Sequence, residues 1–485
     1  MRIIGNRGNT ARKVQAVASG ALASGDTVVV NADGTVSVVS ATANPQSIGT
    51  PVTWQAYSQE DMDVVFDAQQ EKFVVLYRDS NDSSKGKAKV GTASGTTVSF
   101  GSATVFTSNV AESVSGAYDS TNGKIVIGYR DGTNSNYGTA VVGTISGTSI
   151  SFGTPAVFAS AATSFCALAH DPISGKVLIA FRDQANSGYA TAIVATVSGT
   201  SISFGSETLM ASNNVASFMT NVYDSASGKF LIAYSDSNAS EIGKGVVATI
   251  SGTSVSAGSA VTFESSSAFQ GDCATDGAGK LVISYKDSDD SNLLKSVVAT
   301  ISGTTPTFTA AQSDDVGVGG SRPLSITYDA NADKYLIVFR KTTAGDNVSR
   351  YVVATMSGTT LTYGADAELI SNLLERPIGA FDSVQNKILI AYADSSDSTK
   401  GKALVFTSES GNLTSENFIG IASNGYASGQ AATINVKGFI DDNQSSLTAG
   451  QSYFVQTNGD LGLTADDPSV FAGTAVSATK LIVKG

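Results

Sequence analysis

Histidine, cysteine and charge are scarce in this chain of 485 residues. It has one histidine, His170, and two cysteines, Cys166 and Cys273, and only 15% of its residues are charged, against about 25% in typical soluble domains. A single histidine cannot build a His-rich metal site or most Ser and Cys triads, so we expect His170 to be packed or hydrogen-bonded. The cysteines are too far apart in sequence for a CxxC pair, which predicts two buried thiols and no disulfide framework.

Basic charge and long apolar runs are lacking as well. The formal net charge is −12 and the isoelectric point is about 4.6, which leaves no broad basic surface for nucleic acid. No run approaches the roughly 18 apolar residues of a membrane span, and the first 13 residues hold no signal-peptide core. We therefore expect no nucleic-acid partner, no membrane insertion and no Sec export.

The chain does contain an internal repeat, which recurs seven times between residues 58 and 417. Each copy has an Asp-containing turn, an apolar run, an aromatic–cation–Asp motif, a polar loop, a second apolar run and a Ser-Gly turn. Two landmarks keep this period: the first aspartate recurs every 52 or 53 residues and the Ser-Gly pair every 51 to 55. These landmarks are Asp67, Asp119, Asp171, Asp224, Asp276, Asp329 and Asp382, and Ser94, Ser146, Ser198, Ser251, Ser302, Ser357 and Ser410.

The second copy shows most clearly that each repeat is built from strands. Residues 113–118 form a short mixed segment, 124–129 and 139–145 are nearly continuous apolar runs, and 149–152 alternate. This pattern predicts four antiparallel strands. The fold class is therefore all-β, as a seven-bladed β-propeller of four-stranded blades. Residues 47–54 resemble residues 151–158, so we expect the ring to close with an early outer-strand segment on the last blade.

The two ends of the chain resemble each other rather than the blades. Residues 22–38 align without gaps on residues 447–463, with Asp33-Gly34 and Asn458-Gly459 between apolar runs as hairpin signals. We expect each end to contribute at least one hairpin to a shared small β domain. The predicted domains are residues 1–46 and 418–485, which together form this terminal domain, and residues 47–417, the propeller.

The last 65 residues or so also resemble a terminal domain of bacteriophage virion structural proteins, particularly those of tailed phages of marine bacteria. Residues 447–453 and 471–481 carry most of the resemblance. It implies a virion surface protein of the fibre or capsid-appendage type, bound to other virion proteins through the terminal domain, with a host-surface polysaccharide as a further partner. Fibres are commonly trimeric, which leaves a homo-oligomer open, although no coiled-coil heptad supports it.

In an up-and-down blade the Asp-containing turns and the Ser-Gly turns share one face, here called the turn face. The longer polar loops, which begin at Asp79, Asp131, Asp183, Asp236, Asp287 and Asp394, share the other, the loop face. An aromatic–cation pair precedes most of these loops, and it predicts glycan binding by stacking and bidentate hydrogen bonds. The candidate ligand-binding residues are Tyr77, Arg78, Tyr129, Arg130, Arg182, Tyr285, Lys286 and Arg340. In the alternative interpretation each cation pairs with the Asp after it, or with a first-strand Asp of the neighbouring blade, and holds the ring together.

Other site types find little support in the sequence. The loops after Asp79 and Asp287 gather carboxylates, but no glutamate stands at the spacing of a calcium-binding EF-hand loop, so we expect no metal or cofactor. Nor does a glycosidase pair of carboxylates stand out from the repeats. We therefore expect a non-enzymatic protein. A capsid decoration protein and, less favoured, a propeller glycosidase or depolymerase are the alternatives, and positions that depart from the repeat, Ser235, Ala393 and Lys341, are further recognition candidates.

Overall fold

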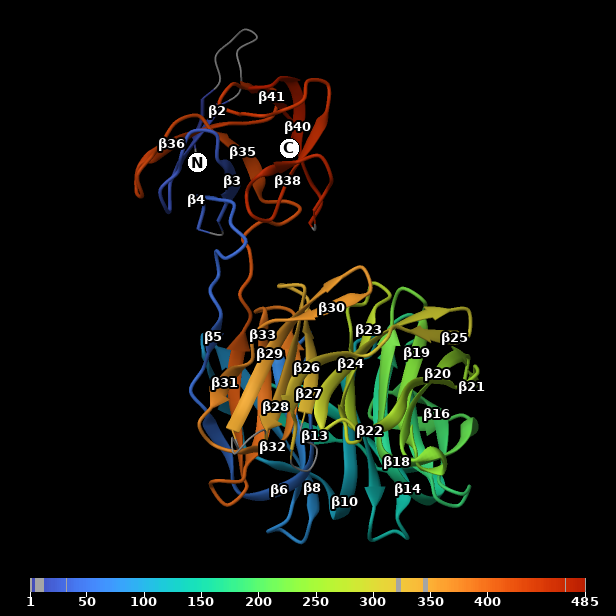
Figure 1. Ribbon diagram of the computed structural model, residues 1–485. Helices are drawn as coiled ribbons and strands as arrows, with labels where there is room; N and C mark the ends of the chain where they lie inside the picture. The colour runs from blue at the N-terminus through green and yellow to red at the C-terminus, as the bar shows by residue number, and fades with distance from the viewer. Residues whose placement is uncertain are drawn as a thin grey trace. The chain divides into compact units, whose positions relative to one another are not determined.

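The computed structural model describes residues 2–4, 13–31, 33–319, 324–342, 348–466 and 468–484. It divides into two units, which are treated separately: unit 1 comprises residues 1–46 and 409–485, and unit 2 comprises residues 47–408. Both are built from antiparallel strands (Figure 1). The described residues include one short 3-10 helix, η1 (Ser237–Ala239), and no helix long and apolar enough to cross a membrane.

The second repeat shows how the sequence produces one sheet of unit 2. Its strands are β10 (Thr104–Asp119), β11 (Lys124–Asp131), β12 (Tyr137–Ser146) and β13 (Ser149–Phe152), paired in chain order. The predicted apolar runs are the two middle strands, and Ile125, Val126 and Ile127 are fully buried because both faces of the sheet are covered. The four predicted strands are confirmed in this repeat.

The first strand is longer than the predicted segment 113–118. Residues 104–110 of β10 pair with β8 of the preceding repeat, and residues 111–119 pair with β11. The strand therefore passes from one sheet to the next, and a β-bulge between Glu112 and Ser115 follows directly after the change of partner. A bulge bends a strand and re-aims its side chains, which is how one chain segment serves two sheets.

The other strands of unit 2 repeat this arrangement. They are β5 (Ser47–Ile48), β6 (Val52–Asp67), β7 (Lys72–Asp79), β8 (Lys85–Ser94), β9 (Thr97–Phe100), β14 (Ala156–Asp171), β15 (Lys176–Asp183), β16 (Tyr189–Ser198), β17 (Ser201–Phe204), β18 (Thr208–Asp224), β19 (Lys229–Asp236), β20 (Ile242–Ser251), β21 (Ser254–Ala257), β22 (Val261–Thr275), β23 (Leu281–Asp287), β24 (Leu293–Ser302), β25 (Thr305–Phe308), β26 (Gln312–Gly317), β27 (Leu324–Asp329), β28 (Lys334–Lys341), β29 (Val348–Ser357), β30 (Thr360–Tyr363), β31 (Ala367–Ile370), β32 (Leu374–Asp382), β33 (Lys387–Asp394) and β34 (Lys400–Thr407).

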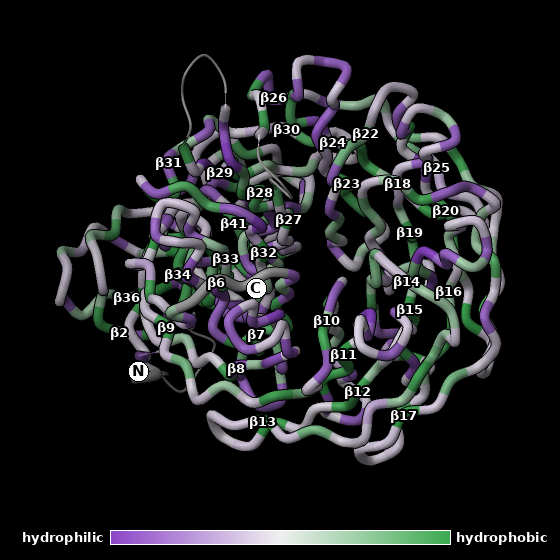
Figure 2. Tube along the Cα trace, turned by 90° about the horizontal axis from the view of Figure 1, so that it is seen from below, coloured by the Kyte–Doolittle hydropathy of each residue, from purple (hydrophilic) through white to green (hydrophobic). Residues whose placement is uncertain are grey.

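The sheets stand side by side in a ring (Figure 2). The ring closes where β34 pairs with β5, through Phe406 with Ile48 and Thr407 with Ser47, and with the start of β6. An early segment of the chain thus supplies the outer strand of the last sheet. This confirms the predicted closure by residues 47–54.

Neighbouring sheets touch through a repeated glycine. A Cβ added to Gly49, Gly101, Gly153, Gly205 or Gly258 would lie 1.8–2.0 Å from the carbonyl oxygen of a threonine in the Ser-Gly-Thr turn of the next repeat. That separation is far below van der Waals contact, so only glycine fits. The glycines of those turns have a different role: Gly147 has φ 61° and open space around its Cα, as a two-residue hairpin loop requires.

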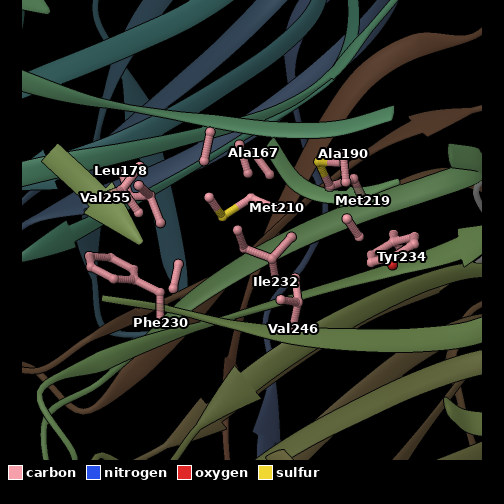
Figure 3. Packing of buried hydrophobic residues seen from close by; sticks show 14 of the residues in the cluster. Ala167, Leu178, Ala190, Met210, Met219, Phe230, Ile232, Tyr234, Val246 and Val255 are labelled. Carbon is pink, nitrogen blue, oxygen red and sulfur yellow. The ribbon is translucent and has the colours of Figure 1, made fainter. Parts of the chain in front are cut away.

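The hydrophobic core of unit 2 lies between adjacent sheets. One cluster joins Leu178 and Ala190 of one repeat to Phe230, Ile232 and Val246 of the next (Figure 3). Phe230 and Ile232 are fully buried. Each sheet is therefore stabilised mainly by contact with its two neighbours.

Unit 1 combines both ends of the chain in two sheets. The first contains β1 (Arg2–Ile4), β2 (Lys13–Val17), β3 (Thr27–Val30), β4 (Val36–Val38), β35 (Phe418–Ala422) and β36 (Ala431–Asn435), in which β2 pairs with β36 and β3 with β35. The second contains β37 (Ile440–Asp441), β38 (Ser452–Val455), β39 (Leu461–Gly462), β40 (Val470–Ser477) and β41 (Lys480–Val483). The expected hairpins are β3–β4 and β38–β39.

The second boundary between the units differs from the expected residue 417. Unit 1 begins again at Glu409, two residues after the end of β34. Leu413 packs in the core of unit 1 with Val29 and Phe418, and the Asn412 side chain donates a hydrogen bond to the carbonyl oxygen of Val38 at 2.8 Å. The last Ser-Gly pair therefore lies outside the ring, because β5 takes the place of the strand that would follow it.

Candidate functional site

The predicted tyrosines lie inside unit 2. Tyr77, Tyr129 and Tyr285 are fully buried, and the Tyr285 hydroxyl donates to Glu264 at 2.6 Å. Burial raises the pKa of Tyr129 to about 12. A ligand cannot reach these rings without separating the sheets. In this structure they are core residues, not the exposed stacking platforms that the sequence suggested.

The predicted cations bridge strands. Arg78 lies 3.4 Å from both Asp61 and Glu112, and Glu112 is also 3.3 Å from Arg130. The remaining cations contact neighbouring side chains in the same way: Arg182 donates to Asn214 at 3.0 Å, Arg340 pairs with Glu375, and the Lys286 ammonium lies 4.4 Å from the centre of the Phe269 ring. Arg78 and Arg340 thus connect one repeat to the first strand of the next, as in the structural alternative.

Where an aspartate follows a predicted cation, its partner differs from the expected one. Asp79 Oδ1 accepts the Asn81 backbone N–H at 3.1 Å, while its Oδ2 pairs with Lys87 at 2.8 Å. Asp287, which follows Lys286, likewise accepts the Asp289 backbone N–H at 3.1 Å and pairs with Lys295 at 2.7 Å. These aspartates cap the loops instead of pairing with the preceding cation. Because lysine ammonium groups already contact these carboxylates, the contacts oppose calcium binding. The part of the chain that the structure describes holds no group of three or more His, Cys, Asp or Glu residues that could bind a metal ion.

The remaining sequence candidates are also engaged in local contacts. Ser235 is buried and hydrogen-bonded to Ser217 Oγ at 2.9 Å, Ala393 is buried, and Lys341 pairs with Asp366 at 3.3 Å. His170 Nε2 lies 3.0 Å from Asp119 Oδ1 of the preceding repeat. The expectation of a hydrogen-bonded histidine is confirmed.

The two cysteines are free, and burial raises the pKa of the Cys166 thiol to about 12. Cys166 is buried, as expected, but Cys273 is only half-buried and lies 3.0 Å from the Thr220 hydroxyl. Both thiols border a cavity of about 300 Å³ at the centre of the ring. Its lining comes from the first strands of the repeats. In β10, Ala111 pairs with Asp131 at the loop face, and Asp119 pairs with Lys124 at the turn face. The lining residues lie nearer the loop-face end of this strand.

Polar side chains of this cavity connect successive repeats. Asp63 Oδ2 accepts the backbone N–H of Gly116 at 2.7 Å, and Asp272 Oδ2 accepts that of Ile326 at 3.0 Å. Ser115 Oγ accepts the N–H of Leu168 at 3.3 Å in the same way. Burial raises the pKa of Asp63 to about 6, against the lowering effect of its hydrogen bonds, and it raises that of Asp272 too.

The raised pKa of Asp63 predicts a pH-dependent contribution to stability. A group whose pKa is higher in the folded state stabilises the fold fully below its unfolded pKa, and this stabilisation disappears as the pH rises through the folded value. The Asp63→Ser variant carries the side chain that the second repeat has at the equivalent position, Ser115, and it lacks the titrating carboxyl group. We compare the free energy of unfolding of the wild type with that of this variant. The wild type minus variant difference is expected to fall by at most about 3 kcal/mol between pH 4 and pH 7.5. Urea titrations at several pH values measure the difference, and a pH-independent difference would contradict it.

No sequence motif marks this cavity. In the sequence, the first-strand segment that lines it is short and mixed in polarity. The polar residues of the cavity come from different repeats, so they share no local motif. One signal was present: Asp63 and Asp272 stand where other repeats carry Ser115, Ala167, Thr220, Ser325 or Ile378. Departures from the repeat along the first strand mark the cavity, whereas the recurring aromatic–cation motif marks contacts between sheets.

Comparisons with known proteins establish the fold. No protein-family model and no curated protein matches the chain. The BP39L lectin from Burkholderia pseudomallei is similar over 74% of this chain and 99% of its own, with a TM-score of 0.53 and 8% identity. A protein of unknown function from Dyadobacter fermentans (75% and 100% covered, TM-score 0.47, 10% identity) and NanB sialidase from Streptococcus pneumoniae (76% and 71%, 0.46, 10%) are less similar. At such identity the likeness shows a β-propeller fold and nothing about ligands.

Proposed function

We propose that this chain is a non-enzymatic, glycan-binding protein of a bacteriophage particle, in which a seven-bladed propeller contacts the host surface and unit 1 attaches to other virion proteins. The seven sequence repeats support the blade count, because the strands of a repeat pair with one another in chain order, the start of a first strand also pairs with the preceding repeat, and β5 supplies the closing strand. The phage assignment rests on the resemblance of the last 65 residues or so to virion terminal domains.

The observation that carries the binding function is the polar cavity at the centre of the ring. Serine, threonine, asparagine and glutamine side chains line it together with Phe165 and Phe218. A mixture of hydrogen-bonding groups and aromatic faces is suited to a sugar, which presents hydroxyl groups at its edges and an apolar face. The BP39L lectin shows by its name that a propeller can serve sugar binding, but its ligand is not transferred here.

The hydrogen bonds of the cavity carboxylates support binding without turnover. Both oxygens of Asp63 accept backbone N–H groups, from Val64 at 2.8 Å and Gly116 at 2.7 Å. Asp272 is bound in the same way by Cys273 and Ile326. A glycosidase needs two carboxyl groups aimed at the scissile bond, whereas these two are held by the backbone.

Binding of the full-length chain to an array of bacterial surface polysaccharides and their oligosaccharides tests the proposal. We expect saturable binding to at least one structure, with no released sugar after prolonged incubation. The absence of any signal above background would contradict the binding function. Release of reducing ends would instead favour the glycosidase or depolymerase alternative.

A further inference from the structure

The first strands carry a repeated backbone distortion at the cavity. Asp61, Ser113, Phe165, Gln270 and Arg376 all have φ between 46° and 52°. Each lies in a β-bulge at the same position of its strand, where the register shifts. The left-handed region is uncommon for residues other than glycine, and it is unfavourable for large side chains. Such strain persists where the surrounding structure holds it in place, often at binding sites.

The backbone of this position is repeated, but its side chain is not. Asp, Ser, Phe, Gln and Arg occupy it in turn, and the last four of these residues line the cavity. A position that served only the fold would be expected to keep one residue type, as the glycines between the sheets do. A recognition surface on a rigid scaffold needs a backbone that keeps its conformation and side chains that differ from one position to the next.

Two amide oxygens of the cavity are suited to accept hydrogen bonds from a ligand. Gln270 Oε1 and Asn221 Oδ1 are buried, and neither has a hydrogen-bond partner among the residues that the structure describes. Buried polar atoms are rarely left unpaired, because each costs free energy unless a partner or water satisfies it. Hydroxyl groups would supply the missing donors, and the Phe165 ring borders the same space.

The size of the cavity restricts the ligand further. Its volume of about 300 Å³ lies at the lower end of the range for small-molecule sites, about 300 to 1,000 Å³. That is enough for one or two sugar rings. A longer stretch of polysaccharide does not fit in that volume.

We infer that the central cavity binds the terminal residue of a glycan chain end-on, with Gln270, Asn221 and Phe165 as its contacts. This inference rests on the proposed glycan binding and specifies where and how it occurs. It predicts a protein that recognises chain ends rather than repeating units. The exposed loops of the loop face would then surround the site without providing its main contacts.

The test compares full-length variants on bacterial capsule and O-antigen oligosaccharides that bind the wild-type chain. Each oligosaccharide is used with its terminal residue free and with the hydroxyl groups of that residue methylated. Gln270→Ala is expected to weaken binding at least about tenfold, since it removes a buried acceptor, and Phe165→Leu to weaken it by removing the ring. Gln69→Ala, a matched change of an exposed glutamine on the turn face, is expected to leave affinity unchanged. Methylation of the terminal residue is expected to abolish binding.

Three results separate this inference from the proposed function. Unchanged affinity of folded Gln270→Ala and Phe165→Leu, or undiminished binding of the methylated oligosaccharides, would overturn the inference while glycan binding itself remained. The absence of wild-type binding to every oligosaccharide would overturn both. Equal thermal midpoints of the variants and wild type ensure that a loss of affinity is not caused by unfolding.

Discussion

Replacing Gly153 by alanine is expected to lower the free energy of unfolding of unit 2 by more than about 3 kcal/mol. The new Cβ would lie 1.9 Å from the carbonyl oxygen of Thr200 in the next repeat. Overpacking usually costs about 1 to 3 kcal/mol because side chains can move aside. Here the obstacle is backbone, and Gly153 itself is held by a hydrogen bond from its N–H to the Val142 carbonyl oxygen at 2.9 Å, so the sheets have to separate.

The single tryptophan gives a specific probe for this effect. Trp54 is buried in unit 2 and packs against Tyr77 beside the closure of the ring, so its fluorescence during urea unfolding reports on the propeller. Gly147→Ala is the control: it introduces the same methyl group at a φ of 61° into open space, which is expected to cost about 1 to 2 kcal/mol of backbone strain. A Gly153→Ala loss no larger than that of Gly147→Ala would contradict the close contact between repeats.

The proposed attachment through unit 1 predicts that deleting residues 418–485 removes the protein from purified virus particles almost completely. The deletion takes away β35 and β36, the partners of β3 and β2, and most of the core that packs against Val29. The remaining N-terminal segments then have no sheet to join, and the proposed attachment surface is lost. Quantitative mass spectrometry of particles assembled with the truncated chain measures the effect.

The same deletion is expected to leave unit 2 folded. Closure of the ring depends on β5 and β34, which both lie outside the deleted residues, so the unfolding transition reported by Trp54 should be retained. Particles that carry the truncated chain at wild-type copy number would contradict attachment through unit 1. Loss of the Trp54 transition would show instead that the two units do not fold independently.

Much of the fold could be predicted because its determinants are local and repeated. Runs such as residues 124–129 are apolar over one strand length, and Gly147 falls where a tight hairpin needs positive φ, so strands and turns follow from short-range rules. The resemblance between residues 47–54 and 151–158 was enough to predict closure. The boundary at Glu409 could not be predicted in this way, because β5 replaces the strand that is expected after the last Ser-Gly pair.

The cavity could not be predicted, because it depends on relations between repeats. The left-handed conformation of Phe165 has no signature in its own sequence, since it arises where a strand changes partner. The cations and tyrosines, in contrast, have a clear sequence motif, but this motif does not mark the cavity. Their regular recurrence suggested a ligand-binding ring, whereas Tyr77 is buried in the core and Arg78 pairs with Glu112 of the next repeat.

The most direct test of the account is an experimental structure of the full-length chain with a bound oligosaccharide taken from the glycan array. We predict density for one terminal sugar residue in the central cavity, within hydrogen-bond distance of Gln270 Oε1 and Asn221 Oδ1 and against the Phe165 ring. Sugar density over the polar loops or at the outer rim, with the central cavity unchanged, would contradict it.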